Sequence, residues 1–176
     1  MYLAASNYEH TQRNAKSSPE GFRFTMNDHT INKCILIVDD EDDLTWSISK
    51  TLAKNDQQFE VICVGDGNAA RTVLAQRHVD VVVSDIRMPG RNGLELLSDI
   101  RRDHPGAKVI IMTAAGSNDL RKELELRGAS FYLEKPFEIR YLRQLIYEAL
   151  DLAPPFANHT PDEKKGTAGF TPIHAD

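Results

Sequence analysis

The sequence predicts an α/β protein built on a doubly wound parallel sheet, and two observations support this fold class. Five short apolar runs alternate with segments of helical pattern, which implies a parallel sheet with right-handed crossover connections. Three of the runs are almost continuous in Val, Ile and Leu, as is typical of strands covered on both faces. The runs are CILIV (34–38), FEVICV (59–64), VDVVVS (79–84), KVIIM (108–112) and SFYL (130–133).

Apolar stripes at helical spacing predict helices that cover this sheet. Such stripes are Leu44–Ile48–Leu52, Leu94–Leu97–Ile100 and Leu142–Leu145–Ile146–Ala149. Each stripe can pack one helix face against the sheet, so we interpret them as core positions. Trp46 lies off the first stripe and is expected to be partly exposed or to contact a partner.

Composition divides the chain into three regions. Residues 1–31 are polar without a sustained apolar period, and residues 153–176 are rich in Pro, Gly and charge. We predict that they form a flexible N-terminal arm and a flexible C-terminal tail. Residues 32–152 have the length of one small domain. Met26 lies a few residues before the first strand and is a candidate alternative start.

The overall composition limits the class of protein. A formal net charge of -5 argues against direct nucleic-acid binding through a basic face. No apolar run approaches the length of a membrane span, and the N-terminus lacks the apolar stretch of a signal peptide. We therefore predict a cytoplasmic protein without a membrane partner. Cys34 and Cys63 lie in apolar runs and are expected to be reduced core residues, not a disulfide.

Polar side chains follow four of the five predicted strands. They are Asp39, Asp40 and Glu41 after the first strand, Asp85 after the third, Thr113 after the fourth and Lys135 after the fifth. Because ligands bind beyond the carboxyl ends of parallel strands, we expect these groups to converge at one rim of the sheet. Alone, each aspartate could be a helix cap, Thr113 a turn residue and Lys135 a surface charge. Only the combination is specific.

The chemistry of this combination points to phosphoryl transfer. Clustered carboxylates repel one another, so the pKa of at least one would be raised, and a divalent cation relieves the repulsion. Hard oxygen ligands suit Mg2+. Mg2+ and the Lys135 ammonium would together stabilise the charge on a phosphoryl group, while Thr113 donates a hydrogen bond to one of its oxygens. One carboxylate could then attack a phosphoryl donor in line.

Four segments resemble the signature segments of two-component response-regulator receiver domains. They are ILIVDDE (35–41), VVVSDIRMPGRNGLELL (81–97), VIIMTA (109–114) and GASFYLEKPF (128–137). The resemblance implies a flavodoxin-like (βα)5 fold with strand order 2-1-3-4-5. It also implies that Asp85 is the phosphoacceptor.

The same resemblance implies roles for the neighbouring residues. Asp40 and Asp85 would be direct Mg2+ ligands, with Asp39 supporting the metal through water and the backbone carbonyl of Arg87 completing the protein ligands. Thr113 and Lys135 would hold the phosphoryl oxygens. Thr113 and Tyr132 would form the switch, and the bond before Pro136 would be cis.

SDIRMPG, the His-Pro pair at 104–105, KPFEI and Trp46 resemble receivers of the nitrogen-regulation class of transcriptional activators. Those activators carry an ATPase domain and a DNA-binding domain after the receiver. Only 24 residues (153–176) follow the predicted domain here, too few for either module. We therefore predict a single-domain response regulator, a signalling phosphoprotein and not a metabolic enzyme.

The expected phosphodonor is a histidine kinase or a His-phosphotransfer protein, and the expected output is a downstream protein. Two alternatives stay open, namely a phosphorelay intermediate that passes the group to another His and a pseudo-receiver that is never phosphorylated. We expect the output surface on the fourth helix, fifth strand and fifth helix. The charges of this surface are Arg121, Lys122, Glu123, Glu125, Arg127, Arg140, Arg143 and Glu148.

Overall fold

The computed structural model describes residues 32–56, 58–88, 92–153 and 171–172. The predicted flexible arm over 1–31, with Met26, lies outside the described residues. So does most of the predicted tail over 153–176.

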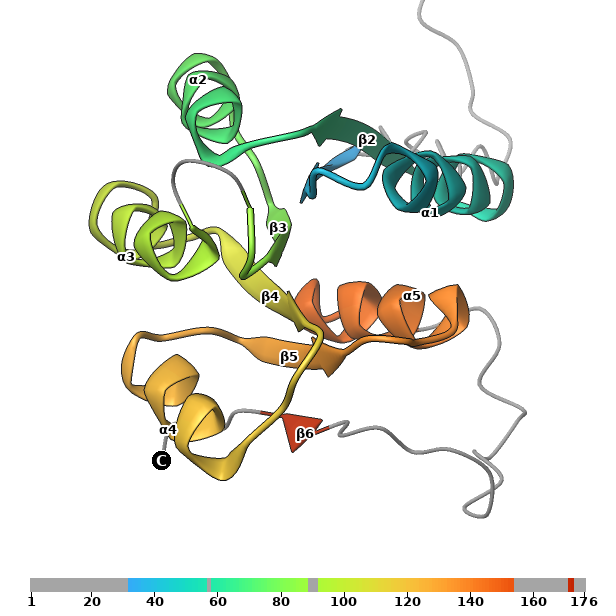
Figure 1. The fold of residues 1–176 in the computed structure, drawn as a ribbon. Helices are drawn as coiled ribbons and strands as arrows, with labels where there is room; N and C mark the ends of the chain where they lie inside the picture. The colour runs from blue at the N-terminus through green and yellow to red at the C-terminus, as the bar shows by residue number, and fades with distance from the viewer. Residues whose placement is uncertain (1–31, 57, 89–91, 154–170, 173–176) are drawn as a thin grey trace, which may run out of the picture.

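Five parallel strands form the centre of the molecule (Figure 1). They are β1 (Lys33–Val38), β2 (Phe59–Val64), β3 (Val81–Asp85), β4 (Lys108–Thr113) and β5 (Phe131–Glu134). Their order is β2-β1-β3-β4-β5, and all four pairings between them are parallel. The predicted flavodoxin-like fold and its strand order are therefore confirmed. The switch in strand order lies between β1 and β3, where ligand sites form in sheets of this kind.

A short sixth strand adds to this sheet. β6 (Thr171–Pro172) pairs antiparallel with β5, so that Thr171 faces Tyr132 and Pro172 faces Phe131. Proline cannot donate a backbone hydrogen bond, so an edge position is one that it tolerates. These two residues of the segment predicted as a tail therefore lie along the outer edge of β5 (Figure 1).

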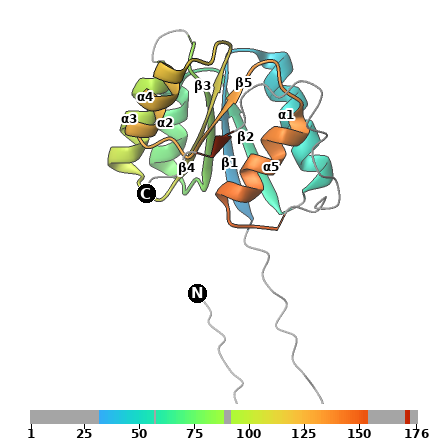
Figure 2. The same ribbon diagram turned by 90° about the horizontal axis from the view of Figure 1, so that it is seen from below.

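Helices cover both faces of the sheet (Figure 2). They are α1 (Asp42–Asn55), α2 (Gly67–Gln76), α3 (Gly93–Asp103), α4 (Asn118–Leu126) and α5 (Ile139–Ala149). α1 and α5 lie on one face, and α2, α3 and α4 lie on the other. The two sides bury separate apolar clusters against alternate residues of the strands. Successive side chains of a strand point to opposite faces of the sheet, so each strand contributes residues to both clusters.

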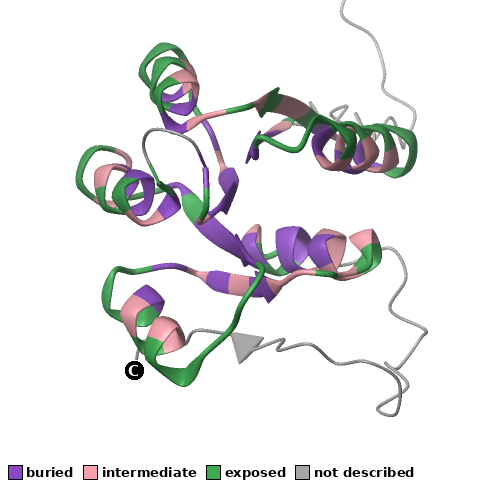
Figure 3. Ribbon diagram, viewed as in Figure 1, coloured by how far each residue is buried: buried purple, intermediate pink, exposed green. Residues whose placement is uncertain are grey.

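The burial pattern confirms the predicted helix stripes (Figure 3). Ile48, Leu52, Leu97 and Ile100 are buried, as are the four stripe residues of α5, and Leu44 and Leu94 pack against the clusters from partly buried positions. Trp46 is 60% exposed, as its position off the stripe predicts. Within the described residues, no helix has both the length and the apolar character to cross a membrane.

The two cysteines differ in environment. Both are free thiols, as predicted, and Cys34 is buried. Cys63 is exposed, so the expectation of a core position is wrong for this residue. The physical reason is that β2 is an edge strand, which is less covered than the strands beside it.

Candidate functional site

The predicted carboxylates converge at the carboxyl ends of two neighbouring strands. Asp39 and Asp40 follow β1, and Asp85 is the last residue of β3. One carboxylate oxygen from each of the three lies within 4.8 Å of the others. Asp39 and Asp85 are buried and Asp40 is exposed, so the cluster opens to solvent on the side of Asp40. Three closely spaced oxygen ligands of this kind suit a small hard cation such as Mg2+.

These aspartates are not the helix caps that a simpler interpretation allowed. The N-cap of α1 is Glu41, and the N-cap of α3 is Asn92, whose side chain accepts from the Glu95 amide. Asp39 Oδ1 instead accepts from the Glu41 amide at 2.9 Å, an interaction within the loop that orients the carboxylate.

Lys135 brings the positive charge to the carboxylates from β5. Its Nζ lies 2.8 Å from Asp39 Oδ2, 2.8 Å from Glu41 Oε1 and 3.7 Å from Asp85 Oδ1. Burial of the side chain opposes the charged form, but these acidic neighbours raise the pKa of Lys135. The ammonium is therefore firmly protonated near neutral pH. Glu41, the third acidic residue after β1, thus contacts Lys135 directly.

Backbone contacts place Lys135 at this point. Its amide donates to the Thr113 carbonyl at 2.7 Å, which extends the pairing of β4 with β5 by one residue. The peptide bond from Lys135 to Pro136 is cis, the isomer that the family resemblance implies.

The carboxyl of Asp85 lies in an environment that disfavours its charge. Burial raises its pKa, Lys135 partly offsets this, and the negative charge of Asp39 raises it further. Its Oδ2 accepts from the Arg87 amide at 3.2 Å. The net direction is a pKa above the ordinary value, so a cation bound among the carboxylates would favour the ionised form.

α3 approaches the backbone of Asp85 closely, and Gly93 makes this approach possible. A Cβ on Gly93 would lie 2.2 Å from the Asp85 carbonyl oxygen, which is a clash with immovable backbone. The Gly93 amide also donates to the Ile86 carbonyl at 3.0 Å. This close backbone contact requires a glycine at position 93.

Thr113 lies at the end of β4 with its hydroxyl turned to its own loop. Its Oγ1 donates to the Ala115 carbonyl at 3.1 Å and accepts from the Ala115 amide at 3.2 Å. Tyr132 is partly buried on β5 and packs against the cluster under α2, α3 and α4. The carboxylates and Lys135 are therefore assembled, while Thr113 is committed to hydrogen bonds within the β4–α4 loop.

The predicted backbone ligand Arg87 follows β3 and is exposed. Its amide contacts Asp85, as described above, which places its main chain beside the carboxylate cluster. Part of the motif after it, residues 89–91, lies outside the described residues.

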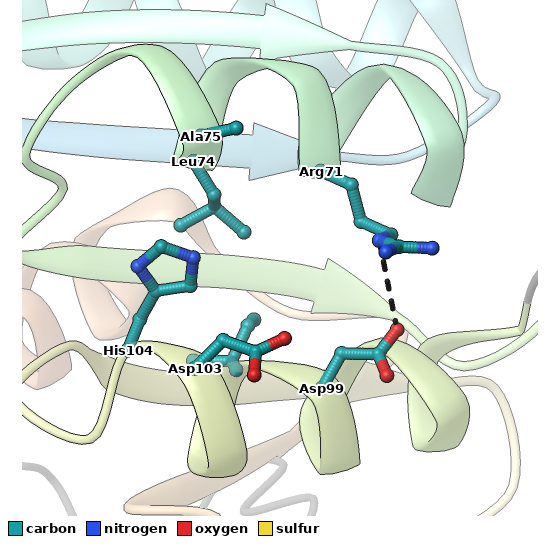
Figure 4. A pocket seen from close by; sticks show the side chains of 7 residues that line it. Arg71, Leu74, Ala75, Asp99, Asp103 and His104 are labelled. Atoms are coloured by element: carbon teal, nitrogen blue, oxygen red, sulfur yellow. Dashed lines mark ion pairs between the residues drawn. The ribbon is translucent and has the colours of Figure 1, made fainter.

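A small cleft between α2 and α3 has no part in this site (Figure 4). It is lined by Arg71, Leu74, Ala75, Asp99, Ile100, Asp103 and His104. Arg71 and Asp99 form an ion pair of 3.9 Å across it. None of the lining residues belongs to the carboxylate cluster, so the cleft and the candidate site are separate features.

Comparisons with known proteins agree with this geometry. Residues 35–147 match the family described as the response regulator receiver domain. The chain is 39% identical over 112 residues to the response regulator protein FleR of Pseudomonas aeruginosa, covering 64% of this chain and 23% of FleR. It is 37% identical over 116 residues to the DNA-binding transcriptional regulator NtrC of Salmonella typhimurium, covering 66% of this chain and 24% of NtrC. The chain thus spans about a quarter of the length of these relatives.

Solved structures match over the same region. The receiver domain of the Francisella response regulator 1452 superposes with a TM-score of 0.64 at 28% identity, covering 68% of this chain and 98% of that one. The response regulator TrrA of Thermotoga maritima, solved in complex with Mg2+ and BeF, gives a TM-score of 0.59 at 30% identity, covering 66% and 98%. By sequence motifs, strand order and site geometry alike, the chain belongs to the response regulator receiver domain family.

Proposed function

We propose that the chain is a phosphoacceptor of a two-component system, and that Asp85 receives the phosphoryl group. One observation carries this proposal: Asp85 lies in a cluster of three carboxylates and 3.7 Å from the partly buried ammonium of Lys135. Asp39 is already held by hydrogen bonds from Lys135 and from the Glu41 amide, whereas Asp85 Oδ1 lies 3.7 Å from Lys135 Nζ, which is longer than a hydrogen bond. Asp85 therefore has an oxygen available to attack.

The proposed reaction balances as a simple displacement. A carboxylate oxygen of Asp85 attacks the phosphorus of a phosphohistidine on a histidine kinase or a His-phosphotransfer protein. The P–N bond breaks, the imidazole keeps its electron pair, and an acyl phosphate forms on Asp85. Lys135 balances charge on the phosphoryl oxygens, and Thr113 donates to one of them after leaving Ala115.

Receiver domains bind Mg2+ at their acidic pocket, and the three carboxylates of this chain fit such an ion. We propose Asp40, Asp85 and the Arg87 carbonyl as direct ligands, with Asp39 acting through water. When bound, Mg2+ would supply positive charge to the transferring group. The direct test of the proposal is incubation with acetyl phosphate, with and without Mg2+. One phosphoryl group per chain should appear, located at Asp85, only when Mg2+ is present.

Mg2+ should stabilise the folded protein in the absence of any phosphodonor. Repulsion among the three carboxylates destabilises the folded state, and the cation relieves it. At a Mg2+ concentration about 100-fold above the dissociation constant, binding adds roughly 2.7 kcal/mol, which is a rise of several degrees in the unfolding midpoint. Thermal unfolding with and without MgCl2 measures this shift.

A matched pair of variants shows whether the shift comes from the predicted site. Asp40→Asn should lose most of it, because a neutral amide is a poorer ligand for a hard cation. Asp43→Asn removes an exposed carboxylate of α1 that lies outside the cluster, so this variant should retain the Mg2+-dependent rise in the unfolding midpoint. Equal shifts in the two variants would contradict the proposed ligand set.

Thr113→Ala should separate phosphorylation from switching. The hydroxyl bonds Ala115 in this structure, and its single hydrogen cannot also serve a phosphoryl oxygen. We expect Asp85 labelling to persist, but beryllofluoride should no longer shift the backbone amide resonances of α4 by NMR. Thr72→Ala on α2 is the control, since that exposed hydroxyl bonds only within its helix among the described contacts. Wild-type α4 shifts in Thr113→Ala would disprove the coupling.

We propose that the output passes through the face formed by α4, β5 and α5. On α4, Arg121 pairs with Glu125 at 3.2 Å and Arg127 pairs with Glu123 at 2.9 Å. Such pairs are the expected pattern of a solvated helix face and add little stability. Leu126 is 89% exposed at the end of the same helix. Lys122 and Leu126 are therefore better probes of partner binding than the paired arginines.

Arg143 does not belong among the free charges of this face. Its guanidinium forms two hydrogen bonds with the buried carboxylate of Asp56, at 2.6 and 2.7 Å. Our expectation that Arg143 contributes a solvated charge to the output surface is corrected by this contact, which sequence spacing does not reveal. Three further statements stay predictions. They are the downstream protein partner, the absence of direct nucleic-acid binding and the cytoplasmic location.

A further inference from the structure

Among the described contacts, the side chain of Glu134 holds the β4–α4 loop from β5. Glu134, the last residue of β5, accepts a hydrogen bond on Oε1 from the Gly116 amide at 2.8 Å. Residues 114–117, which link β4 to α4, are exposed, so little buried surface fixes their conformation. A charged acceptor on a backbone amide is among the stronger hydrogen bonds that such a loop can form.

The carboxylate also packs directly on the Gly116 backbone. A Cβ at position 116 would lie between 2.8 and 2.9 Å from the carboxylate carbon and oxygens of Glu134. A Cβ at position 116 would therefore push the Glu134 carboxylate out of its present position, and the hydrogen bond needs an acidic or amide side chain at position 134. The pair is specific in shape as well as in hydrogen bonding.

This contact and the hydrogen bonds of Thr113 act on the same loop. Thr113 and Glu134 are register partners in the pairing of β4 with β5. Between them, the loop folds so that the Thr113 hydroxyl bonds the Ala115 backbone. Holding Gly116 against Glu134 keeps Ala115 within reach of Thr113, and so keeps that hydroxyl from the phosphoryl position.

We propose that Glu134 is a positioning residue that holds the β4–α4 loop in its resting arrangement and so sets how readily the domain switches. This inference rests on the proposed phosphorylation of Asp85. When Thr113 turns toward a phosphoryl group, the hydrogen bond from Gly116 to Glu134 is given up. Loss of the Glu134 carboxylate therefore favours the reactive arrangement before any phosphorylation.

The test compares Glu134→Ala with Glu134→Gln in the full chain. One hydrogen bond shifts a two-state equilibrium roughly fivefold. Glu134→Ala should therefore be labelled by acetyl phosphate about fivefold faster than wild type. Glu134→Gln keeps an amide oxygen as acceptor and should stay close to the wild-type rate. Glu148→Ala, an exposed position on α5, is the control for loss of a surface carboxylate.

A second variant approaches the contact from its other side. Gly116→Ala should displace the carboxylate and produce the same faster labelling. Because both changes remove one contact, the double variant Gly116→Ala/Glu134→Ala should be no faster than either single variant. Additive rates would show that the two residues act separately and would overturn the proposal.

The Gly116 amide gives a readout that does not depend on phosphorylation. In unphosphorylated protein its hydrogen exchange, measured by NMR, should accelerate in Glu134→Ala and be largely restored in Glu134→Gln. If wild type is not labelled at Asp85, the proposed function fails, while the exchange result still decides the role of Glu134 in holding the loop. Unchanged exchange together with unchanged or slower labelling in Glu134→Ala would overturn the inference.

Discussion

Asp85→Asn is expected to abolish labelling by acetyl phosphate. The amide nearly preserves the shape of the side chain but removes the nucleophilic oxygen, and neither Asp39 nor Asp40 is placed to substitute. Asp39 is fully buried and held by Lys135, while Asp40 is exposed at the mouth of the cluster. Intact-mass measurement after incubation with acetyl phosphate and Mg2+ checks this. Asp119→Asn on α4 is the control and should be labelled at the wild-type rate.

Stability distinguishes loss of the nucleophile from loss of the fold. The pKa of Asp85 is raised by burial and by Asp39, so the folded state favours the protonated carboxyl. Its contribution to stability is therefore present below the ordinary aspartate pKa and is lost as the pH rises through the raised value. At neutral pH without Mg2+, Asp85→Asn should be at least as stable as wild type in thermal unfolding. Retained labelling, or a large loss of stability, would contradict the assignment.

The sequence predicts the candidate site well because its residues are defined by their positions after strands. Asp39, Asp85 and Lys135 follow three separate apolar runs, and parallel strands deliver their carboxyl ends to one edge. The rule needs only strand positions and strand order. The rule does not specify which side chains contact one another within the site. That Glu41 holds Lys135 while Thr113 turns to Ala115 depends on side-chain torsions.

Other features were missed for different reasons. The predicted strand order already placed the second strand at the sheet edge, but we based the expectation for Cys63 on its apolar run alone. The contact from Glu134 to Gly116 joins two exposed positions without any periodic pattern. Arg143 looks like one more charge on an amphipathic helix, because its partner Asp56 lies 87 residues earlier in the chain.

Because of this partner, loss of Arg143 should lower the stability of the folded protein strongly. The Asp56 carboxylate is fully buried, and it accepts from Arg143 through two nitrogens and from the Tyr147 hydroxyl at 2.6 Å. The cluster ties the end of α1 to α5. Removing one partner of a buried ion pair leaves an uncompensated charge, which costs about 3 kcal/mol or more. Arg143→Met, which keeps most of the aliphatic stem, should lower the free energy of unfolding in urea by roughly this amount.

Two comparisons show whether the stranded charge is the cause. Adding Asp56→Asn to Arg143→Met removes that charge, so the double variant should recover part of the lost stability, as a strong coupling in a double-mutant cycle. Arg140→Met breaks the exposed contacts with Glu138 and with its neighbour Tyr141, and it should cost at most about 1 kcal/mol. If Arg140→Met and Arg143→Met lowered the free energy of unfolding by similar amounts, Arg143 would have to be regarded as an ordinary solvated surface charge. If Arg143→Met instead costs clearly more stability than Arg140→Met, a charge reversal at Arg143 would report on folding and not on partner binding. Partner binding then has to be tested with substitutions at Lys122 and Leu126.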